Sequence, residues 1–306
     1  MRKQQAKNRG LTLIELLVTI MIMGIVIAIA VPVLRPPVDA RSVKEAARMV
    51  STALASARTK SIETGQSWGV EFTPLSSSDS SQVGTLHFCR VTDSYEGFNG
   101  EITDQGDFKG LYDPAKITVP WNVLKYGGWL RFGYQGKKYL VPDDKKELEN
   151  PPGITTLIQL NPAPATGAAS SIDFQFYPAP RKSSLMPIQL PSRAVVDMGL
   201  SGVGDTFGNN GTPIQKITFT KTGEVDQFHT SLGSSDASER IHFFIERTGR
   251  TDTQSTDPED NHLQDGEAIW VSIDPRTGAI KSAENKPPAN LETLNTIENA
   301  RSWANE

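Results

Sequence analysis

The stretch NRGLTLIELLVTIMIMGIVIAIAVPVL, residues 8–34, decides the architecture of this chain. Its apolar run from Leu11 to Val31 contains 21 residues. At about 1.5 Å per residue, a helix of this length covers roughly the 30 Å hydrocarbon core of a bilayer. The run therefore predicts a transmembrane helix. It carries one acid, Glu15, and no basic residue that could neutralise it.

Two simple interpretations of this run compete: a secretory signal peptide and an ordinary single-pass anchor. A signal peptide ends in small residues of an A-x-A-like cleavage site, whereas here AIAVPVL is followed by Arg35, Pro36 and Pro37. A plain anchor has no use for Glu15, because a carboxylate inside a membrane is costly and needs a partner. Neither interpretation explains the acid.

A partner for Glu15 exists if the chain is cut between Gly10 and Leu11. The cut creates an α-amino group four residues before Glu15. The same ammonium on a neighbouring identical helix can neutralise the carboxylate across a helix interface. Glu15 would then set the register of a helical assembly.

The segment resembles the processing and assembly segment of type IV prepilins and type II secretion pseudopilins. The resemblance rests on the short basic leader, the apolar residue and TLIELL stretch that follow it, and three marker residues: Gly10, Gly24 and Pro32. It implies a prepilin peptidase that cleaves after Gly10 and methylates the new N-terminal amine of Leu11, with Glu15 as the assembly residue. The family usually has Phe or Met in place of Leu11, a mild departure.

The resemblance also implies a cellular location and a function. It implies a single-pass protein of the inner (cytoplasmic) membrane, with its head on the extracytoplasmic side, that later joins a periplasmic or surface filament. The implied partners are the peptidase, other pilin or pseudopilin subunits and the inner membrane. The implied function is structural, in a type II secretion or type IV pilus filament, most like a minor pseudopilin and not an enzyme.

The expected fold class is α+β and type IV pilin-like: a long N-terminal hydrophobic helix, kinked or broken near the prolines, packed on an antiparallel β-sheet head. Four parts are expected along the chain: a basic leader peptide at residues 1–10, a transmembrane and assembly helix at 11–34, an amphipathic stem helix at 35–64 and a β-rich globular head at 65–306. The head is expected to contain insertions in the range 73–187.

The prolines after the apolar run depart from the family pattern, in which the helix generally continues as one rod. Pro36 and Pro37 lack amide donors and disfavour helix in the residues before them, so we expect a kink or short break. Asp39 can cap a new helix that runs to about Glu63. One face of this helix is apolar at alternating four- and three-residue spacing, through Val43, Ala47, Val50, Leu54 and Ala57.

Three segments near the C-terminus pair a period-two apolar pattern with a Thr-Gly dipeptide. They predict three hairpin-like units of an antiparallel sheet, because alternate residues line one face and glycine permits the positive φ of tight turns. The dipeptides are Thr222-Gly223, Thr248-Gly249 and Thr277-Gly278. The residues expected on the inner face are Ile217, Phe219, Ile241, Phe243, Ile245, Ile269, Val271 and Ile273.

The stem helix with its Ala-Arg pairs, the strand WGVEF after it and this distal sheet resemble the H-type minor pseudopilins and related minor pilins. The likeness covers residues 1 to about 72 well and 188–282 loosely. Residues 73–187 exceed what a minimal pilin head needs. Within and just after them, GTLHFCRV, GGWLRFGYQGKKYLVP, GITTLIQL, SIDFQFYPAP and RAVVDM are predicted strands.

Charge and cysteine content narrow the function classes. The net charge is -4, but without the ten-residue leader the chain has 27 basic and 35 acidic residues, a net charge of -8. Nucleic-acid affinity comes mostly from basic side chains that displace counterions, so this balance disfavours a nucleic-acid partner. Cys89 is the only cysteine, which excludes an intramolecular disulfide, and we expect it to be a buried strand residue.

The residues predict no catalytic group and no cofactor. The histidines at 87, 229, 242 and 262 lack metal-ligand spacing, and no P-loop or nucleophile elbow occurs. The segment DTQSTDPEDNHLQDGE offers oxygens that can hold calcium, but its spacing does not match an EF-hand, so a solvated acidic loop is the favoured interpretation. The calcium candidates are Asp257, Glu259, Asp260 and Asp265, with Asp252 nearby.

Two alternatives stay open. Aromatic residues gather between Trp121 and Tyr139, where core and cross-strand pairing is favoured over an exposed contact face for another pilin or a substrate. The protein can also be a minor pilin with an adhesive or DNA-uptake head, or an enzyme tethered by a pilin-like anchor. The acidic balance weakens the DNA version, and no constellation of residues supports the enzyme.

Overall fold

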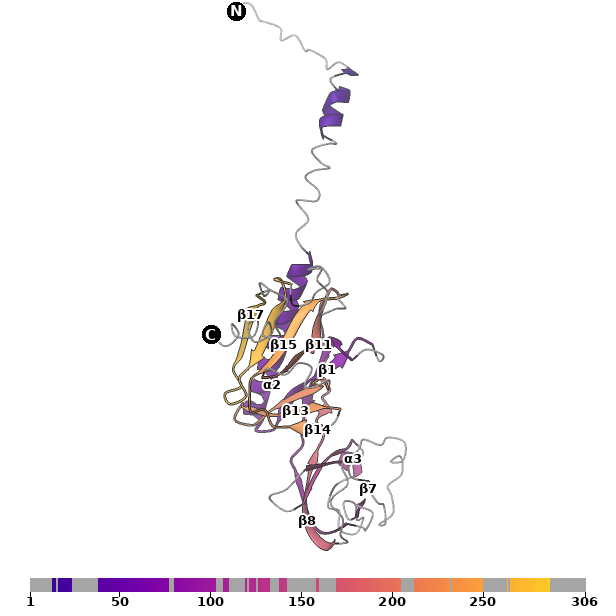
Figure 1. The fold of residues 1–306 in the computed structure, drawn as a ribbon, viewed down its shortest axis with the longest axis vertical. Helices are drawn as coiled ribbons and strands as arrows, with labels where there is room; N and C mark the ends of the chain where they lie inside the picture. The colour runs from indigo at the N-terminus through magenta and orange to yellow at the C-terminus, as the bar shows by residue number, and fades with distance from the viewer. Residues whose placement is uncertain are drawn as a thin grey trace, which may run out of the picture.

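Two antiparallel β-sheets and one long helix make up most of the computed structural model (Figure 1). The structure describes residues 13–14, 16–23, 38–76, 80–102, 107–109, 119, 121–124, 126–132, 138–141, 158–159, 169–204, 212–231, 233–249, 263 and 265–286.

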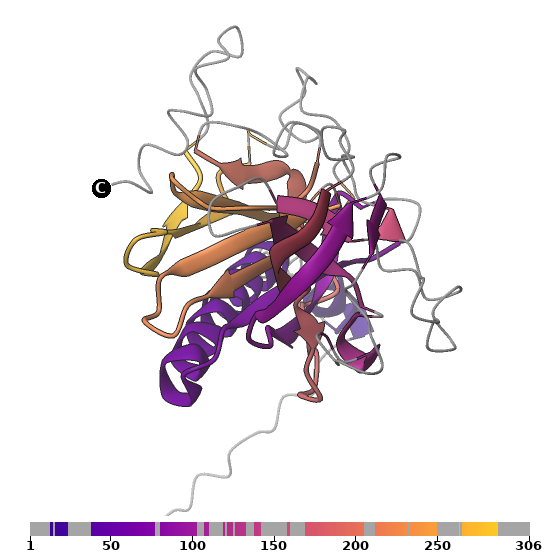
Figure 2. The ribbon, with the colours of Figure 1, turned by 90° about the horizontal axis from the view of Figure 1, so that it is seen from below.

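Helix α2 (Val38–Thr64) is 27 residues long and confirms the helix predicted from Asp39 to about Glu63. Its interior holds neither glycine nor proline and many alanines, a composition that favours helix. The helix lies along one face of the larger sheet (Figure 2), and its apolar stripe is buried there. The buried residues of this stripe are Val43, Ala46, Ala47, Val50, Ala53, Leu54 and Ala57. The expected kink near the prolines lies outside the described residues.

Within the described residues, the larger sheet has eleven strands, in the order β14-β13-β12-β1-β2-β11-β15-β16-β17, with β9 and β10 also paired to β2. Its strands are β1 (Trp68–Pro74), β2 (Gln82–Arg90), β9 (Arg181–Lys182), β10 (Ile188–Gln189), β11 (Ala194–Val203), β12 (Lys216–Phe219), β13 (Val225–Thr230), β14 (Gly233–Ser235), β15 (Ile241–Arg247), β16 (Ile269–Ile273) and β17 (Ile280–Glu284).

The main hydrophobic core lies between α2 and this sheet. All eight residues expected on the inner face of the distal strands are buried there, which confirms the period-two prediction. Phe72 of β1 stacks on Phe243 of β15 with ring centroids 4.6 Å apart. The opposite face of β15 and β16 is also covered, by a smaller cluster around Trp270 that the sequence did not indicate.

Two of the three Thr-Gly segments are tight hairpins: Gly223 lies between β12 and β13, and Gly278 lies between β16 and β17. The prediction was wrong for the third. Strand β15 ends at Arg247, and Gly249 begins a longer connection before β16, although these two strands do pair antiparallel. A Thr-Gly pair can end a strand without forming a tight hairpin, because the length of the loop depends on the residues that follow the pair.

The second sheet is inserted between β2 and β9 and has the order β6-β5-β8-β3-β4-β7 among the described residues. It lies at the end of the molecule away from the N-terminal segment (Figure 1). Its core centres on Phe108, Leu130, Phe174 and Phe176. The elements are β3 (Tyr95–Ile102), β4 (Asp107–Lys109), the short helix α3 (Trp121–Leu124), β5 (Gly128–Phe132), β6 (Lys138–Val141), β7 (Ile158–Gln159) and β8 (Ala169–Pro178).

The region expected to contain insertions, 73–187, therefore serves both sheets. Strands β2 and β9 belong to the larger sheet, and Tyr95–Pro178 builds the second one. The predicted β segment GGWLRFGYQGKKYLVP contains the antiparallel pair β5 and β6. The predicted strand GITTLIQL is represented only by the two residues of β7.

Arg58 joins the far end of α2 to both tight hairpins. Its Nε donates to the carbonyl of Gly223 and its Nη2 donates to the carbonyl of Thr277, each over 3.0 Å. The two turns lie so close that a Cβ added at Gly278 would stand 1.9 Å from the Gly223 oxygen. Because Gly278 also has a φ of +62°, both its backbone conformation and the space around it require glycine.

The contact at Gly278 gives a prediction with a matched control. Gly249→Ala adds a methyl group at a φ of +93° with nothing within 4 Å, so we expect it to lower the free energy of unfolding by about 1–2 kcal/mol. Gly278→Ala adds the backbone clash, so we expect a further loss of about 1–3 kcal/mol. Urea unfolding of the full chain in detergent measures both. Equal losses in the two variants would show that the turns are not packed against each other.

Candidate functional site

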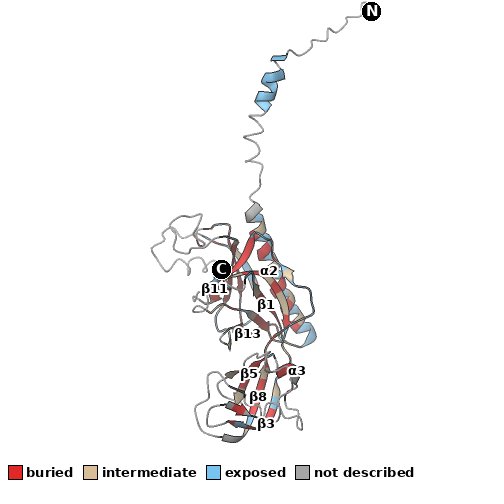
Figure 3. Ribbon diagram, turned by 90° about the vertical axis from the view of Figure 1, so that its right-hand side faces the viewer, coloured by how far each residue is buried: buried red, intermediate tan, exposed pale blue. Residues whose placement is uncertain are grey.

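The described part of the N-terminal apolar run is helical and fully accessible. Residues 13–14 and 16–23 are all exposed (Figure 3). Leu13 is 83% exposed and Met23 is 65% exposed. Within the described ranges, no helix combines the length and apolarity that crossing a membrane requires. Gly10, Leu11 and Glu15, the predicted processing and assembly residues, lie outside those ranges, and their pairing stays a prediction.

Such a surface has a direct physical consequence. Nine large apolar side chains stand exposed on this helical segment, whereas soluble monomers rarely expose contiguous apolar patches of this kind. Burying one Leu or Ile side chain gains about 1.5–3 kcal/mol, so covering this helix with lipid or with other apolar helices is strongly favourable. The nine are Leu13, Ile14, Leu16, Leu17, Val18, Ile20, Met21, Ile22 and Met23.

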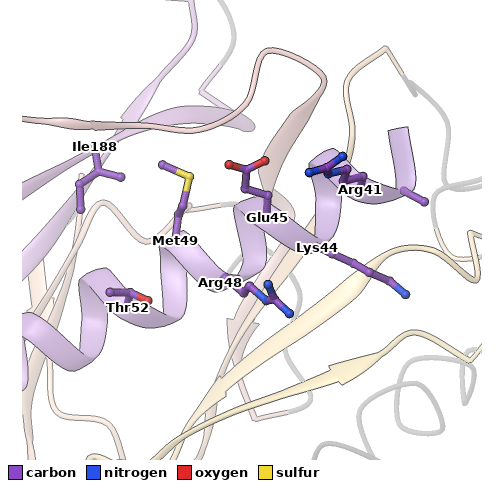
Figure 4. Close-up of a pocket in the computed structure, with 8 residues that line it drawn as sticks. Arg41, Lys44, Glu45, Arg48, Met49, Thr52 and Ile188 are labelled. Atoms are coloured by element: carbon purple, nitrogen blue, oxygen red, sulfur yellow. The ribbon is translucent and has the colours of Figure 1, made fainter. Parts of the chain in front are cut away.

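Helix α2 presents its other side to solvent. There it forms an open groove of about 820 Å³ with Ile188 of β10 (Figure 4). Arg41, Lys44 and Arg48 make this groove basic, and Lys44 pairs with Glu284 of β17 over 3.1 Å. The pair is well exposed, so it contributes little to stability.

The two sheets meet at a buried imidazole. His229 of β13 is 5% exposed and packs on Trp129 of β5, with ring centroids 4.9 Å apart. Burial lowers the pKa of His229 to about 3, and the ammonium groups of Lys216 and Lys138 act in the same direction. The imidazole is therefore neutral at physiological pH.

Because the His229 imidazole is buried and neutral, we expect the free energy of unfolding to fall at acidic pH. The unfolded chain binds a proton at His229 below about pH 6.5, whereas the folded chain does so only near pH 3. Between these values the unfolded state holds more protons, so stability falls by up to about 1.4 kcal/mol per pH unit as the pH falls. His87, whose pKa is also lowered by burial, acts in the same sense, while burial raises the pKa of Asp226 and opposes it at acidic pH.

The measurement is the free energy of unfolding at about pH 6 and pH 5, for the wild type and for His229→Gln. The other titrating groups are common to both proteins, so the difference in slope isolates His229. We expect the variant's slope to be lower by about 1 kcal/mol per pH unit. Identical slopes would contradict a buried neutral imidazole at this position.

The other described histidines and the one described calcium candidate have ordinary partners. His87 contacts Thr73 over 3.1 Å, and His242 contacts Ser272 over 2.7 Å. Asp265 is buried, and its Oδ2 accepts from Arg247 Nε over 3.3 Å. The described residues contain no group of three metal-ligating side chains. The calcium candidates Asp257, Glu259 and Asp260, and the histidine at 262, lie outside them, so the calcium site stays untested.

Cys89 is confirmed as a buried strand residue. It is 0% exposed on β2, and burial raises the pKa of its thiol to about 12. Thiolate is the reactive form of cysteine, so this group is inert at physiological pH.

The aromatic residues between Trp121 and Tyr139 that the structure describes are mostly core residues, which agrees with the favoured interpretation. Trp129 is 7% exposed, and Phe132 and Tyr139 pair across β5 and β6 with ring centroids 5.3 Å apart. Tyr126 differs: it is 38% exposed, and the guanidinium of Arg181 lies 4.2 Å from its ring centroid. Sequence reasoning missed both Arg181 and Arg58, because their partners are distant along the chain.

One comparison with known families gives a match. Residues 5–31 match the family model described as the prokaryotic N-terminal methylation motif. No curated protein and no solved structure matches the chain. The motif indicates a type IV pilin-like or pseudopilin subunit, a structural class whose members are usually not enzymes.

Proposed function

We propose that the protein is a structural subunit of a type II secretion or type IV pilus filament. In this proposal a prepilin peptidase cleaves after Gly10 and methylates Leu11. The subunit then lies in the inner membrane with both sheets on the extracytoplasmic side, and it enters a filament through its N-terminal helix, with Glu15 paired to a neighbour's amine. Its partners are the peptidase, the membrane and other pilin-like subunits.

The observation that carries the proposal is the methylation motif at residues 5–31 followed by an α+β body. The described part of the apolar helix is exposed along its whole length, as lateral packing requires. Helix α2 is amphipathic and packs on an antiparallel sheet, a construction suited to linking a membrane segment to a head.

Within this proposal we favour a minor pseudopilin of the H type. The support is the resemblance of the stem and distal sheet, together with the second sheet, which adds a large unit beyond a minimal head. The alternative is a minor pilin whose head is adhesive or takes up DNA. The second sheet, at the end away from the N-terminal segment, is a suitable place for adhesion (Figure 1). The net acidic balance disfavours DNA.

Site-specific photo-crosslinking tests this function. A photoreactive phenylalanine analogue replaces Ile20, which is 64% exposed on the apolar helix, or Met186, which is 86% exposed on the body, as the control. We expect position 20 to yield adducts with proteins that carry the same methylation motif, and position 186 to yield few of them. Adducts with lipid alone at position 20 would indicate a plain membrane anchor.

A further inference from the structure

A small pocket lies where the chain crosses between the two sheets. Its volume is about 300 Å³, and it is lined by the start of β1, the end of β2 and the strand β9 with the serines that follow it. Strand β9 comes directly after β8 of the second sheet, so the pocket belongs to the junction. The lining residues used below are Trp68, Arg90, Thr92, Arg181, Lys182 and Ser183.

The described lining of this pocket is cationic and holds no acidic side chain. Lys182 is already paired, because its ammonium lies 3.2 Å from the Glu71 carboxylate outside the pocket. The guanidinium groups of Arg90 and Arg181 have no ion-pair partner among the described residues. The net positive charge of the pocket therefore comes from these two arginines.

Arg181 has a fixed orientation, but part of its guanidinium group lacks hydrogen-bond acceptors. Its guanidinium lies over the ring of Tyr126, which orients its plane. Its Nε and Nη2 are buried and have no hydrogen-bond partner among the described residues. Burial lowers the pKa of Arg181 and Arg90 lowers it further, yet an arginine stays charged, so two N–H donors of a cation are left buried without an acceptor.

Thr92, which also lines this pocket, has a third polar atom without a hydrogen-bond partner. Its Oγ1 is buried and has no hydrogen-bond partner among the described residues. Buried polar atoms are nearly always hydrogen-bonded in folded proteins, and those left unpaired are costly. These three atoms belong to two residues that line one cationic cavity, and an anion with several acceptor oxygens bound there could satisfy them after a small side-chain adjustment.

We propose that this pocket binds a tetrahedral oxyanion, a phosphate or sulfate group. An arginine fork matches two oxygens of such an anion, and the remaining oxygens can accept from Thr92, Ser183 or Arg90. The group can be free or carried on a larger molecule, since its chemistry toward the protein is the same. A carboxylate presents its two oxygens in one plane, whereas a tetrahedral anion directs its oxygens to several sides of the cavity.

The test is isothermal titration of the full chain in detergent, at constant ionic strength, with inorganic phosphate, sulfate, glycerol phosphate and acetate. We expect saturable binding of phosphate and sulfate but not of acetate. Glycerol phosphate binding more tightly than phosphate would indicate a carried group, and equal binding would indicate the free anion. No saturable binding of any tetrahedral anion would overturn the proposal.

Three variants assign the binding to this pocket. Arg181→Gln should weaken phosphate binding by about tenfold or more, because it removes a charge-assisted pair of donors. Thr92→Val keeps the shape and removes an unpaired hydroxyl, so we expect an unchanged unfolding temperature with binding about three- to tenfold weaker. The control Arg48→Gln removes the same charge from the α2 groove and should leave binding unchanged.

Equal weakening in Arg181→Gln and in the control Arg48→Gln would show a general charge effect and overturn the proposal, as would unchanged binding in Thr92→Val. If Arg181→Gln does not fold, Thr92→Val and Arg90→Gln carry the test, because Arg90 is exposed and its guanidinium supports no other described contact.

Discussion

Gly10→Val is expected to leave the leader attached to nearly all of the protein. Glycine has no side chain, so the backbone at the cut can approach a peptidase closely, whereas valine places two methyl groups on a stiff Cβ at that point. Without the cut, no α-amino group forms at Leu11. The variant should then lose filament incorporation together with processing, because Glu15 has no cationic partner.

Intact mass measurement of the membrane-extracted variant shows whether residues 1–10 are still present. Asn8→Val is the matched control, since it introduces the same bulk two residues before Gly10. We expect the control to be processed like the wild type. Normal removal of the leader from Gly10→Val would contradict cleavage at Gly10.

Glu15→Ala is expected to separate processing from assembly. The cut precedes Glu15, so the leader should be removed as in the wild type. In the filament, however, the neighbour's ammonium would be left without a partner in an apolar interface, and breaking one side of a buried ion pair costs about 3–5 kcal/mol. We therefore expect incorporation to fall by about a hundredfold or more.

The measured quantity is the ratio of this subunit in the sheared filament fraction to the amount in the membrane. Glu15→Gln keeps the shape without the charge, so it should also fail to incorporate if charge is what matters. Thr19→Ala, a polar-to-apolar change one turn further along the same run, is the control and should assemble normally. Wild-type incorporation of Glu15→Ala would defeat the pairing argument.

The parts of the fold that the sequence predicted are those governed by local periodicity. The stem helix appears in the sequence because residues such as Val43, Val50 and Leu54 recur with helical spacing. The inner faces of β12, β15 and β16 appear because their apolar residues alternate. In each case the burial pattern is a property of one short segment, and all of these residues enter one core.

The parts that the sequence did not predict depend on pairing between distant segments. Strand β2 pairs with β1, which precedes it, and with β9, β10 and β11, which lie about a hundred residues after it in the stretch 181–203. The chain leaves this strand to build a whole second sheet before it returns at Arg181. Nothing in the local pattern of GTLHFCRV distinguishes a strand of the larger sheet from one of the inserted sheet.

The same reason applies to the functional residues. Gly10, Leu11 and Glu15 stand together in one short motif, so the sequence alone indicates them, and the family match at residues 5–31 agrees with the motif. Arg58 contacts two turns that lie more than 160 residues away along the chain. The pocket around Arg181 likewise combines β1, β2 and β9, and no sequence motif connects these strands.

The most direct test of the account is the intact mass and N-terminal sequence of the protein extracted from its native membranes. We expect a chain that begins with methylated Leu11, with Glu15 as its fifth residue. A chain that begins at Met1, or at a residue beyond Val31, would contradict it and leave Glu15 without a partner.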